Sequence, residues 1–341
     1  MIPLYYHEDY VDYFFGRLHP FDPLRFPQFI ELVREDEELN GVFEIREAPL
    51  ASDDVLQMVH TPGYIRNVYE IEKSGGRLSG DTPVKMGAPE AARRIVGGTL
   101  EAVEHASQGH RALNLGGLHH AGRHYGEGFC IFNDVAVGAE HMARKGKKVC
   151  VLDTDAHQGN GTMDIFYDDP RVLFISLHQD PYTLYPGRGF VHEIGKGVGE
   201  GYTVNIPMPR DANVADYRYS MEEVVFPIVN KFRPDMVIRN GGSDPHYSDT
   251  LTDLGLDMAG LQYLGEATRA LADENRAGHV ELMLSGYGPR VIEGWIAILK
   301  GAFSLNMELP SDRVLASPED PPGEAVKDMV RKLKDIMGSY W

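Results

Sequence analysis

The stretch KVCVLDTDAHQGN, residues 148–160, begins as an apolar run and ends in Asp153, Asp155 and His157, spaced two residues apart. Because side chains alternate along a strand, these three lie on one side of it. Carboxylates are costly to bury together without a partner, and an imidazole with carboxylates in an open coordination shell suits a catalytic zinc or similar divalent metal. A further ligand must come from elsewhere, and Asp244 is the candidate. Helix capping would explain one aspartate, not both together with the histidine.

Several other short apolar runs indicate strands. They are rich in Val, Ile and Leu with little polar alternation, as in strands covered on both faces. Together with 147–155, these runs are 111–117, 171–178, 235–242 and 280–287. Helical patterns lie between many of them, at 88–107, 133–146 and 261–276. This alternation predicts an α/β fold with a central, mostly parallel sheet flanked by helices. No domain boundary is evident, so residues 1–341 are expected to form a single domain, with a Pro-rich loop and a terminal helix within 307–341.

Polar side chains lie near the end of each apolar run or directly after it. Besides the first cluster, they are His119 and His120, Ser176 and His178, Ser243, Asp244 and His246, and Tyr287. A single such residue is more often a cap or turn residue. In open α/β sheets, however, ligands bind at the carboxyl ends of the strands. The recurrence over five runs therefore predicts an active site at this edge of the sheet.

The composition limits the partners. The formal net charge is −18, which argues against direct nucleic-acid binding and favours cationic substrates, although it also serves solubility alone. Cys130 and Cys150 are flanked by apolar residues, so we expect buried, reduced thiols and a cytoplasmic protein. The N-terminus does not resemble a signal peptide, and no apolar run is long enough to predict a membrane span.

The chain resembles histone deacetylases and their bacterial and archaeal relatives over roughly residues 1–300. The motifs that carry this resemblance occur in the family's order: HPFDPLR (19–25), VHTPGYI (59–65), GGLHHAGRHYGEGFCIFND (116–134), DTDAHQGNGT (153–162), VLFISLH (172–178), NGGSDPHYSD (240–249) and SGYG (285–288). The paired histidines with GFCIFND and the Asp-x-Asp-x-His block are specific signals. The resemblance implies a single α/β domain like that of arginase.

The resemblance also implies roles for individual residues. The expected ligands of Zn²⁺, or alternatively Fe²⁺, are Asp155, His157 and Asp244. The expected catalytic residues are His119, His120, Tyr287 as a hydrogen-bond donor to the substrate carbonyl, Asp153 facing His119, and Asn160 facing His120. The expected substrate-binding residues are Gly128, Phe129 and Tyr185 in the tunnel and Asp81 at the rim. Asp153 and Ser176 are expected beside a structural K⁺.

Two positions depart from the commoner family pattern. His-Gln-Gly-Asn-Gly (157–161) replaces His-His-Gly-Asp-Gly and is the form carried by class IV histone deacetylases. Neutral Asn160 stabilises a charge on His120 less than a carboxylate would. We therefore expect His120 to be the base and His119, paired with Asp153, to be the protonated partner. Ser285 and Gly286 stand before Tyr287, where many relatives have a run of glycines.

These features predict an amidohydrolase that removes acetyl or other acyl groups from lysine side chains or related amines. An acetylpolyamine or small-amine deacetylase is the alternative, and a homo-oligomer is possible. An arginase-like ureohydrolase with two manganese ions is less favoured, because Gly159 and Gly242 stand where a second metal needs carboxylates. A non-catalytic binding relative is disfavoured because the ligands, both histidines and Tyr287 are all present.

Overall fold

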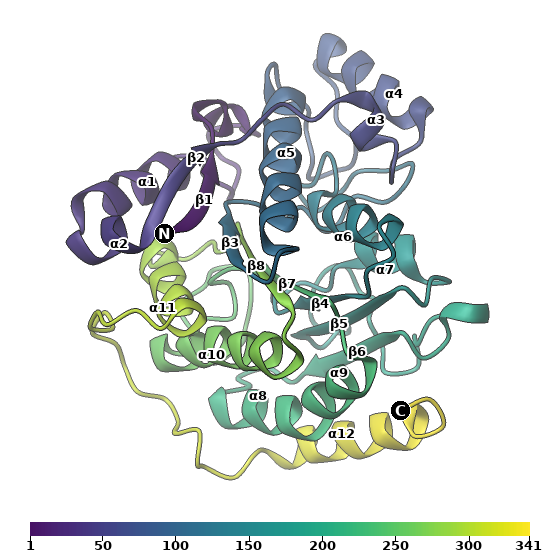
Figure 1. Cartoon of the computed structure of the whole chain (residues 1–341), viewed down its shortest axis with the longest axis vertical. Coiled ribbons are helices and arrows are strands. Elements are labelled where there is room, and N and C mark those ends of the chain that lie inside the picture. Colours follow the sequence, from purple (N-terminus) through teal and green to yellow (C-terminus); the bar gives the residue numbers. More distant parts are fainter.

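The computed structural model describes residues 1–341, and one sheet of eight strands forms its centre (Figure 1). The strands are β1 (Ile2–Tyr6), β2 (Phe43–Glu47), β3 (Arg111–Asn114), β4 (Val149–Asp153), β5 (Val172–Gln179), β6 (Thr203–Met208), β7 (Met236–Gly241) and β8 (Gly278–Met283). They lie in the order β2-β1-β3-β8-β7-β4-β5-β6, and every neighbouring pair is parallel. The predicted α/β class is therefore confirmed.

Twelve α-helices surround the sheet. They are α1 (Arg25–Glu35), α2 (Glu37–Val42), α3 (Asp53–Leu56), α4 (Pro62–Ser74), α5 (Ala88–Ala106), α6 (Asp134–Arg144), α7 (Asn160–Phe166), α8 (Val214–Ser220), α9 (Phe226–Phe232), α10 (Met258–Asn275), α11 (Val291–Phe303) and α12 (Glu324–Met337). Short 3₁₀ segments occupy Glu8–Asp12 and Gly197–Gly199, and a π-helical turn occupies Met221–Val225. None of the helices combines the length and apolar character needed to cross a membrane.

The five predicted strands correspond to β3, β4, β5, β7 and β8. The last of them ends at Met283 rather than 287, because the chain turns into a loop in which Gly286 has a φ of +130°. Strands β1, β2 and β6 were not predicted. The predicted helices correspond to α5, α6 and α10, and α12 is the expected terminal helix.

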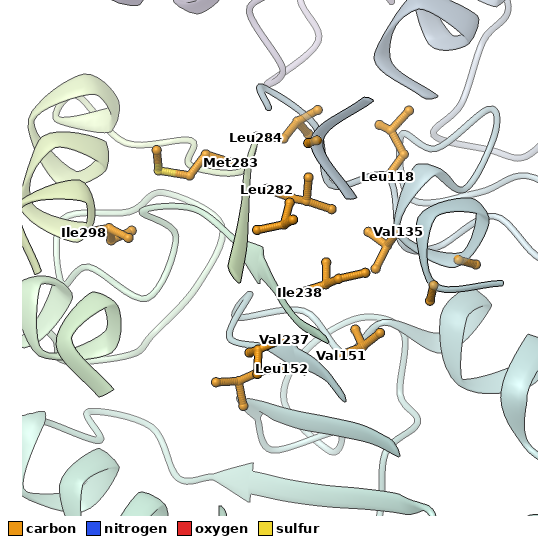
Figure 2. Close-up of a cluster of buried hydrophobic side chains, with 14 of the residues drawn as sticks. Leu118, Val135, Val151, Leu152, Val237, Ile238, Leu282, Met283, Leu284 and Ile298 are labelled. Atoms are coloured by element: carbon orange, nitrogen blue, oxygen red, sulfur yellow. The ribbon is translucent and has the colours of Figure 1, made fainter. Parts of the chain in front are cut away.

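The sheet is buried on both faces, which explains the continuous apolar runs. Helices α5 and α6 cover one face, and α10 and α11 lie on the other (Figure 1). Figure 2 shows the alternation: Val151 and Ile238 lie on the side of Val135 in α6, whereas Leu152 and Val237 point the opposite way. The core built in this way is one continuous hydrophobic cluster, and both cysteines are buried within it as free thiols, as predicted.

Strand register brings the carboxyl ends of the central strands together. Asp153, the last residue of β4, is paired with Ser176 of β5 on one side and with Asn240 of β7 on the other. The loops after β4 and β7 therefore leave the sheet side by side. This register, rather than closeness in sequence, places the polar residues of both loops in one site.

Candidate active site

A cavity of about 270 Å³ opens at this edge of the sheet. Its lining combines charged and polar groups with aromatic and aliphatic walls. The lining residues are Asp81, Gly117, His119, His120, Gly128, Phe129, Cys130, Asp155, His157, Leu184, Tyr185, Leu251, Leu284, Ser285 and Tyr287. A concave, largely apolar pocket with a few convergent polar groups is the usual form of a small-molecule site.

Three side chains could hold a divalent metal: Asp155 and His157 line the cavity, and fully buried Asp244 adjoins them. One potential ligand atom from each of Asp155, His157 and Asp244 lies within 4.8 Å of the others. Nδ1 of His157 lies 3.1 Å from Oδ1 of Asp155 and 3.1 Å from Oδ2 of Asp244. All three residues are buried, so two carboxylates share a site almost without solvent. Two carboxylates and one imidazole fit zinc or a similar ion and leave coordination positions free for water and substrate.

Close backbone packing positions the third of these residues. Asp244 follows β7 by three residues, and its Oδ1 accepts a hydrogen bond of 2.8 Å from Oγ of Ser285, beyond the end of β8. A side chain at position 242 would place its Cβ 2.0 Å from the carbonyl oxygen of Ser285. Gly242 is therefore required for this approach, which explains why the Asn-Gly-Gly-Ser-Asp motif has no larger residue there.

His119 lies in an anionic environment. Its Nδ1 is 3.3 Å from Oδ1 of Asp153, and its Nε2 is 3.8 Å from Oδ2 of Asp155. Burial opposes a charge on this imidazole, but Asp153 and Asp155 outweigh burial and raise the pKa of His119 to about 9. The other oxygen of Asp153 accepts hydrogen bonds from the Gly159 amide (2.9 Å) and from Oγ of Ser176 (3.1 Å), which hold the carboxylate in place.

His120 lies in a different environment, although the two ring centroids are only 4.1 Å apart. Its Nδ1 is 2.7 Å from Oδ1 of Asn160, the first residue of α7. Burial, followed by the positive charges of His119 and His157, lowers the pKa of His120 well below its ordinary value. The pair therefore holds one charged and one neutral imidazole at neutral pH.

Tyr287 is held in the loop after β8. Its amide donates a 2.6 Å hydrogen bond to Asp249, and buried Arg25 donates to the carbonyl oxygens of Leu284 (2.9 Å) and Gly286 (2.8 Å). The tyrosine ring lies 6.1 Å from the His157 ring, centroid to centroid. Burial, and then the nearby metal-site carboxylates, raise the pKa of Tyr287 well above its ordinary value, so its hydroxyl stays protonated and can donate a hydrogen bond.

The aromatic walls are held in position by backbone contacts. Phe129 has a left-handed backbone (φ +66°), stabilised by a hydrogen bond from the Tyr13 hydroxyl to its carbonyl oxygen (2.6 Å) and by donation of its amide to Thr82 (3.0 Å). Its ring lies 5.7 Å from that of Tyr287. Tyr185 faces His120, with ring centroids 5.2 Å apart.

Two further expected residues, Gly128 and Asp81, line the cavity. Gly128 has a φ of +56°, and a Cβ there would lie 2.5 Å from the His120 ring, so no larger residue fits. Asp81 lines the cavity, and its Oδ1 accepts hydrogen bonds from Thr82 (2.9 Å) and from the Gly128 amide (3.3 Å). The structure thus brings every expected metal, catalytic and substrate-binding residue to one cavity or to its immediate surroundings.

Several contributors were not predicted. Nδ2 of Asn240 lies 3.0 Å from Oδ1 of Asp153 and 2.9 Å from Nδ1 of His119, so it touches both members of that pair. Its position near the end of the predicted strand 235–242 could have identified it as a site residue. Glu127 contacts Asn160, and no pattern in the sequence indicated that. His246, two residues after Asp244, does not join the metal cluster, and its Nε2 pairs with Oδ2 of Asp312 at 3.0 Å.

The Asn-Asp pair that ends GFCIFND has a structural role. Asn133 caps α6 by accepting a hydrogen bond from the Ala136 amide, and its Nδ2 donates to the carbonyl oxygens of His119 (3.2 Å) and Ala121 (2.8 Å). Asp134 accepts from the amides of Gly117 and Leu118. Both residues therefore hold the loop that carries the histidine pair.

Comparison with known proteins identifies the family of this chain. Residues 19–301 match the family model described as a histone deacetylase domain. The chain is 33% identical to the "Probable deacetylase" of Archaeoglobus fulgidus, across 98% of this chain and 97% of that protein. It is 34% identical to the acetoin utilization protein AcuC of Bacillus subtilis, across 89% of this chain and 78% of that protein. Among solved structures, the HD domain of HDA15 superposes with a TM-score of 0.87 and 27% identity, covering 100% of this chain and 96% of that one.

The fold and the polar cluster at its carboxyl edge define an α/β protein with a candidate metal site. The chain belongs to the histone deacetylase family. The resemblance inferred from its motifs is thereby confirmed, and the names of its relatives support a deacetylase activity.

Proposed function

We propose that this protein is a metal-dependent amidohydrolase that removes acetyl or other acyl groups from lysine side chains or related amines. One observation carries the proposal: Asp155 and His157 line the cavity that also holds the histidine pair and Tyr287, and buried Asp244 completes a metal-competent cluster with them. Zinc suits these ligands best, and iron is the alternative. When bound, the metal supplies Lewis acidity, which lowers the pKa of water to roughly 7 and polarises an amide carbonyl.

The two imidazoles divide the proton transfers between them. His120 is neutral, so it accepts the proton of the attacking water as general base. His119 is held protonated beside Asp153, so it donates a proton to the leaving amine. The Tyr287 hydroxyl donates a hydrogen bond to the oxygen of the tetrahedral intermediate, a contact whose loss typically costs about 2.7–4 kcal/mol of transition-state stabilisation.

The shape and charge of the site support an acylated cationic amine as substrate. Phe129, Tyr185 and Leu251 give apolar walls for an alkyl chain, and Asp81 supplies an acidic group in the lining. Acetylpolyamines, which keep further ammonium groups, and acetyl-lysine within a basic peptide both meet this description, because the acylated nitrogen itself is uncharged. We further propose that Asp153 and Ser176 lie beside a structural potassium ion and that the protein acts in the cytoplasm without direct contact with nucleic acid or membrane. Assembly into a homo-oligomer would restrict the entrance so that only small amines, and not proteins, reach the site.

A substrate panel with defined metals tests the proposal. The chain is stripped with chelator, reloaded with Zn²⁺ or Fe²⁺, and assayed with acetyl-lysine peptides, longer acyl-lysine peptides and acetylpolyamines. We expect release of the carboxylic acid that stops on chelation and returns on reloading. Asp168→Asn is the control, because Asp168 is exposed and remote from the cavity. Absence of acyl release with every metal and substrate would refute the proposal, and urea release from arginine or agmatine would favour the ureohydrolase instead.

A further inference from the structure

Glu127 has a contact that the proposed mechanism does not use. It lies in the loop between the histidine pair and α6, and its Oε1 accepts a 2.6 Å hydrogen bond from Nδ2 of Asn160. Oδ1 of the same amide lies 2.7 Å from Nδ1 of His120. A carboxylate, an amide and an imidazole therefore form a chain that ends at the proposed general base.

The direction of each hydrogen bond in this series follows from the groups that form it. An ionised carboxylate accepts hydrogen bonds and cannot donate them, so only the NH₂ end of Asn160 can face Glu127. The carbonyl end must then face His120. A carbonyl oxygen accepts, so Nδ1 of His120 must carry the hydrogen, and Nε2 is left as the basic nitrogen of the neutral ring. Without the carboxylate, the amide could turn over and favour the opposite tautomer.

The backbone around Glu127 supports a defined position for its side chain. The Cys130 amide donates a 2.9 Å hydrogen bond to the Glu127 carbonyl oxygen, which closes a tight turn. The glycines on either side are sterically required: a Cβ at 126 would lie 2.3 Å from the Tyr64 hydroxyl, and one at 128 would meet the His120 ring. Glu127 is also partly buried beside Tyr185, whose pKa is raised by burial and then by the negative charge of Glu127.

We infer that Glu127 is a positioning residue for the proposed reaction: through the Asn160 amide it keeps His120 in the tautomer with hydrogen on Nδ1. The inference rests on the proposed function. In this protein, two residues therefore replace the commoner aspartate at position 160: Asn160 contacts the imidazole, and Glu127 supplies the carboxylate. A purely structural glutamate would affect stability without affecting the tautomer.

The matched variants are Glu127→Met, Glu127→Gln and the exchanged pair Asn160→Asp with Glu127→Gln. Met leaves the NH₂ of Asn160 unpaired, and we expect kcat to fall about tenfold while KM stays within about twofold. This loss is smaller than the 10²–10⁴-fold that a general base typically contributes, because His120 itself remains in place. Gln can face Asn160 with either end, so a smaller loss is expected. Asn160→Asp alone sets two carboxylates against each other and loses about tenfold. Glu70→Met, at an exposed position of α4, controls for the substitution itself.

The exchanged pair is the decisive variant. The new carboxylate at position 160 would accept from Nδ1 of His120, and the new amide at position 127 would donate to that carboxylate, so the polarity of the chain is restored. We expect kcat to recover to within about threefold of the unaltered protein, a coupling that independent sites do not show. If the losses of the two single variants simply multiply, or if Glu127→Met retains full kcat, the inference is wrong.

A spectroscopic measurement separates this inference from the proposed function. In protein labelled with ¹⁵N-histidine, the shifts of the His120 ring nitrogens, assigned by their absence in His120→Ala, report which nitrogen carries the hydrogen. We expect the Nδ1–H form in the unaltered protein and a change toward Nε2–H in Glu127→Met. An unchanged tautomer in Glu127→Met would overturn the inference even if the enzyme is active, whereas lack of turnover by the unaltered protein with the expected tautomers would overturn only the proposed function.

Discussion

Replacement of Asp153 by Asn should move the basic limb of the kcat profile to lower pH. Asp153 is the strongest of the groups that raise the pKa of His119 to about 9, against an ordinary value of 6.5. In Asp153→Asn the amide cannot supply that charge, so the pKa of His119 should fall toward its ordinary value of 6.5, the limit reached if Asp155 only offsets the effect of burial. A pKa difference of about 2.5 corresponds to about 3.4 kcal/mol between the two protonation states.

The effect on rate follows from the protonated fraction of His119. A general acid must carry its proton, so activity is lost as pH rises through the pKa of His119. At pH 8 a pKa of about 9 leaves a protonated fraction of about 0.9, whereas a pKa of about 6.5 leaves about 0.03. The expected loss of kcat in Asp153→Asn is therefore up to about 30-fold at pH 8 and much smaller at pH 6.

The assay is the pH dependence of kcat between pH 6 and 10 with an acetylated lysine peptide at saturating concentration. Metal content is measured in parallel, and Asp168→Asn provides the control. If the basic limb stays at the same pH in Asp153→Asn while the metal content is unchanged, His119 is not the acid that this reasoning assigns.

Two further predictions concern single side chains. Tyr287→Phe should lower kcat by about 10²–10³-fold with little change in KM or metal content, because it removes only the hydroxyl donor to the developing oxyanion; an unchanged kcat in steady-state assays would show that the hydroxyl is not used. Burial opposes a charge on Asp312, but a hydrogen bond from His246 and other contacts lower its pKa to about 2 from 3.8. A lowered carboxyl pKa stabilises the fold above the unfolded value, and the benefit disappears as pH falls toward 2. Asp312→Asn should therefore be about 1 kcal/mol less stable at pH 6, after allowance for solvent screening, with the difference shrinking below pH 4 in denaturant titrations; a difference independent of pH would contradict this account.

The central strands were predictable because burial on both faces makes each of them a continuous apolar run in the sequence. Strands such as VCVLD in β4 are apolar at nearly every position, whereas β2, FEIRE, lies at the sheet edge and is only half buried. Strand β6, the opposite edge, carries Asn205 and Pro207 within TVNIPM. These edge strands lack the continuous apolar run that identifies a strand from sequence, so tertiary pairing was needed to find them.

The candidate site likewise contains residues that the sequence identified and residues that it did not. Asp155 and His157 lie at the end of one predicted strand and Asp244 shortly after another, and the meeting of strand ends at one edge, together with the family resemblance, was enough to suggest that they form one site. Asn240 and Glu127 contribute through contacts that depend on strand register and on a tight glycine-flanked turn. A charged residue such as Glu127 in a polar loop looks like an ordinary surface residue until the three-dimensional path of the chain places it against Asn160.

The most direct test of the central claim is the divalent metal content of the purified, reloaded protein and of Asp244→Asn. Because Asp155, His157 and Asp244 form a single three-ligand cluster, elemental analysis after dialysis should find about one zinc ion per chain in the unaltered protein and in Asp168→Asn. Asp244→Asn should retain much less zinc at the same free metal concentration and show no acyl release. Full occupancy and undiminished activity in Asp244→Asn would contradict the account.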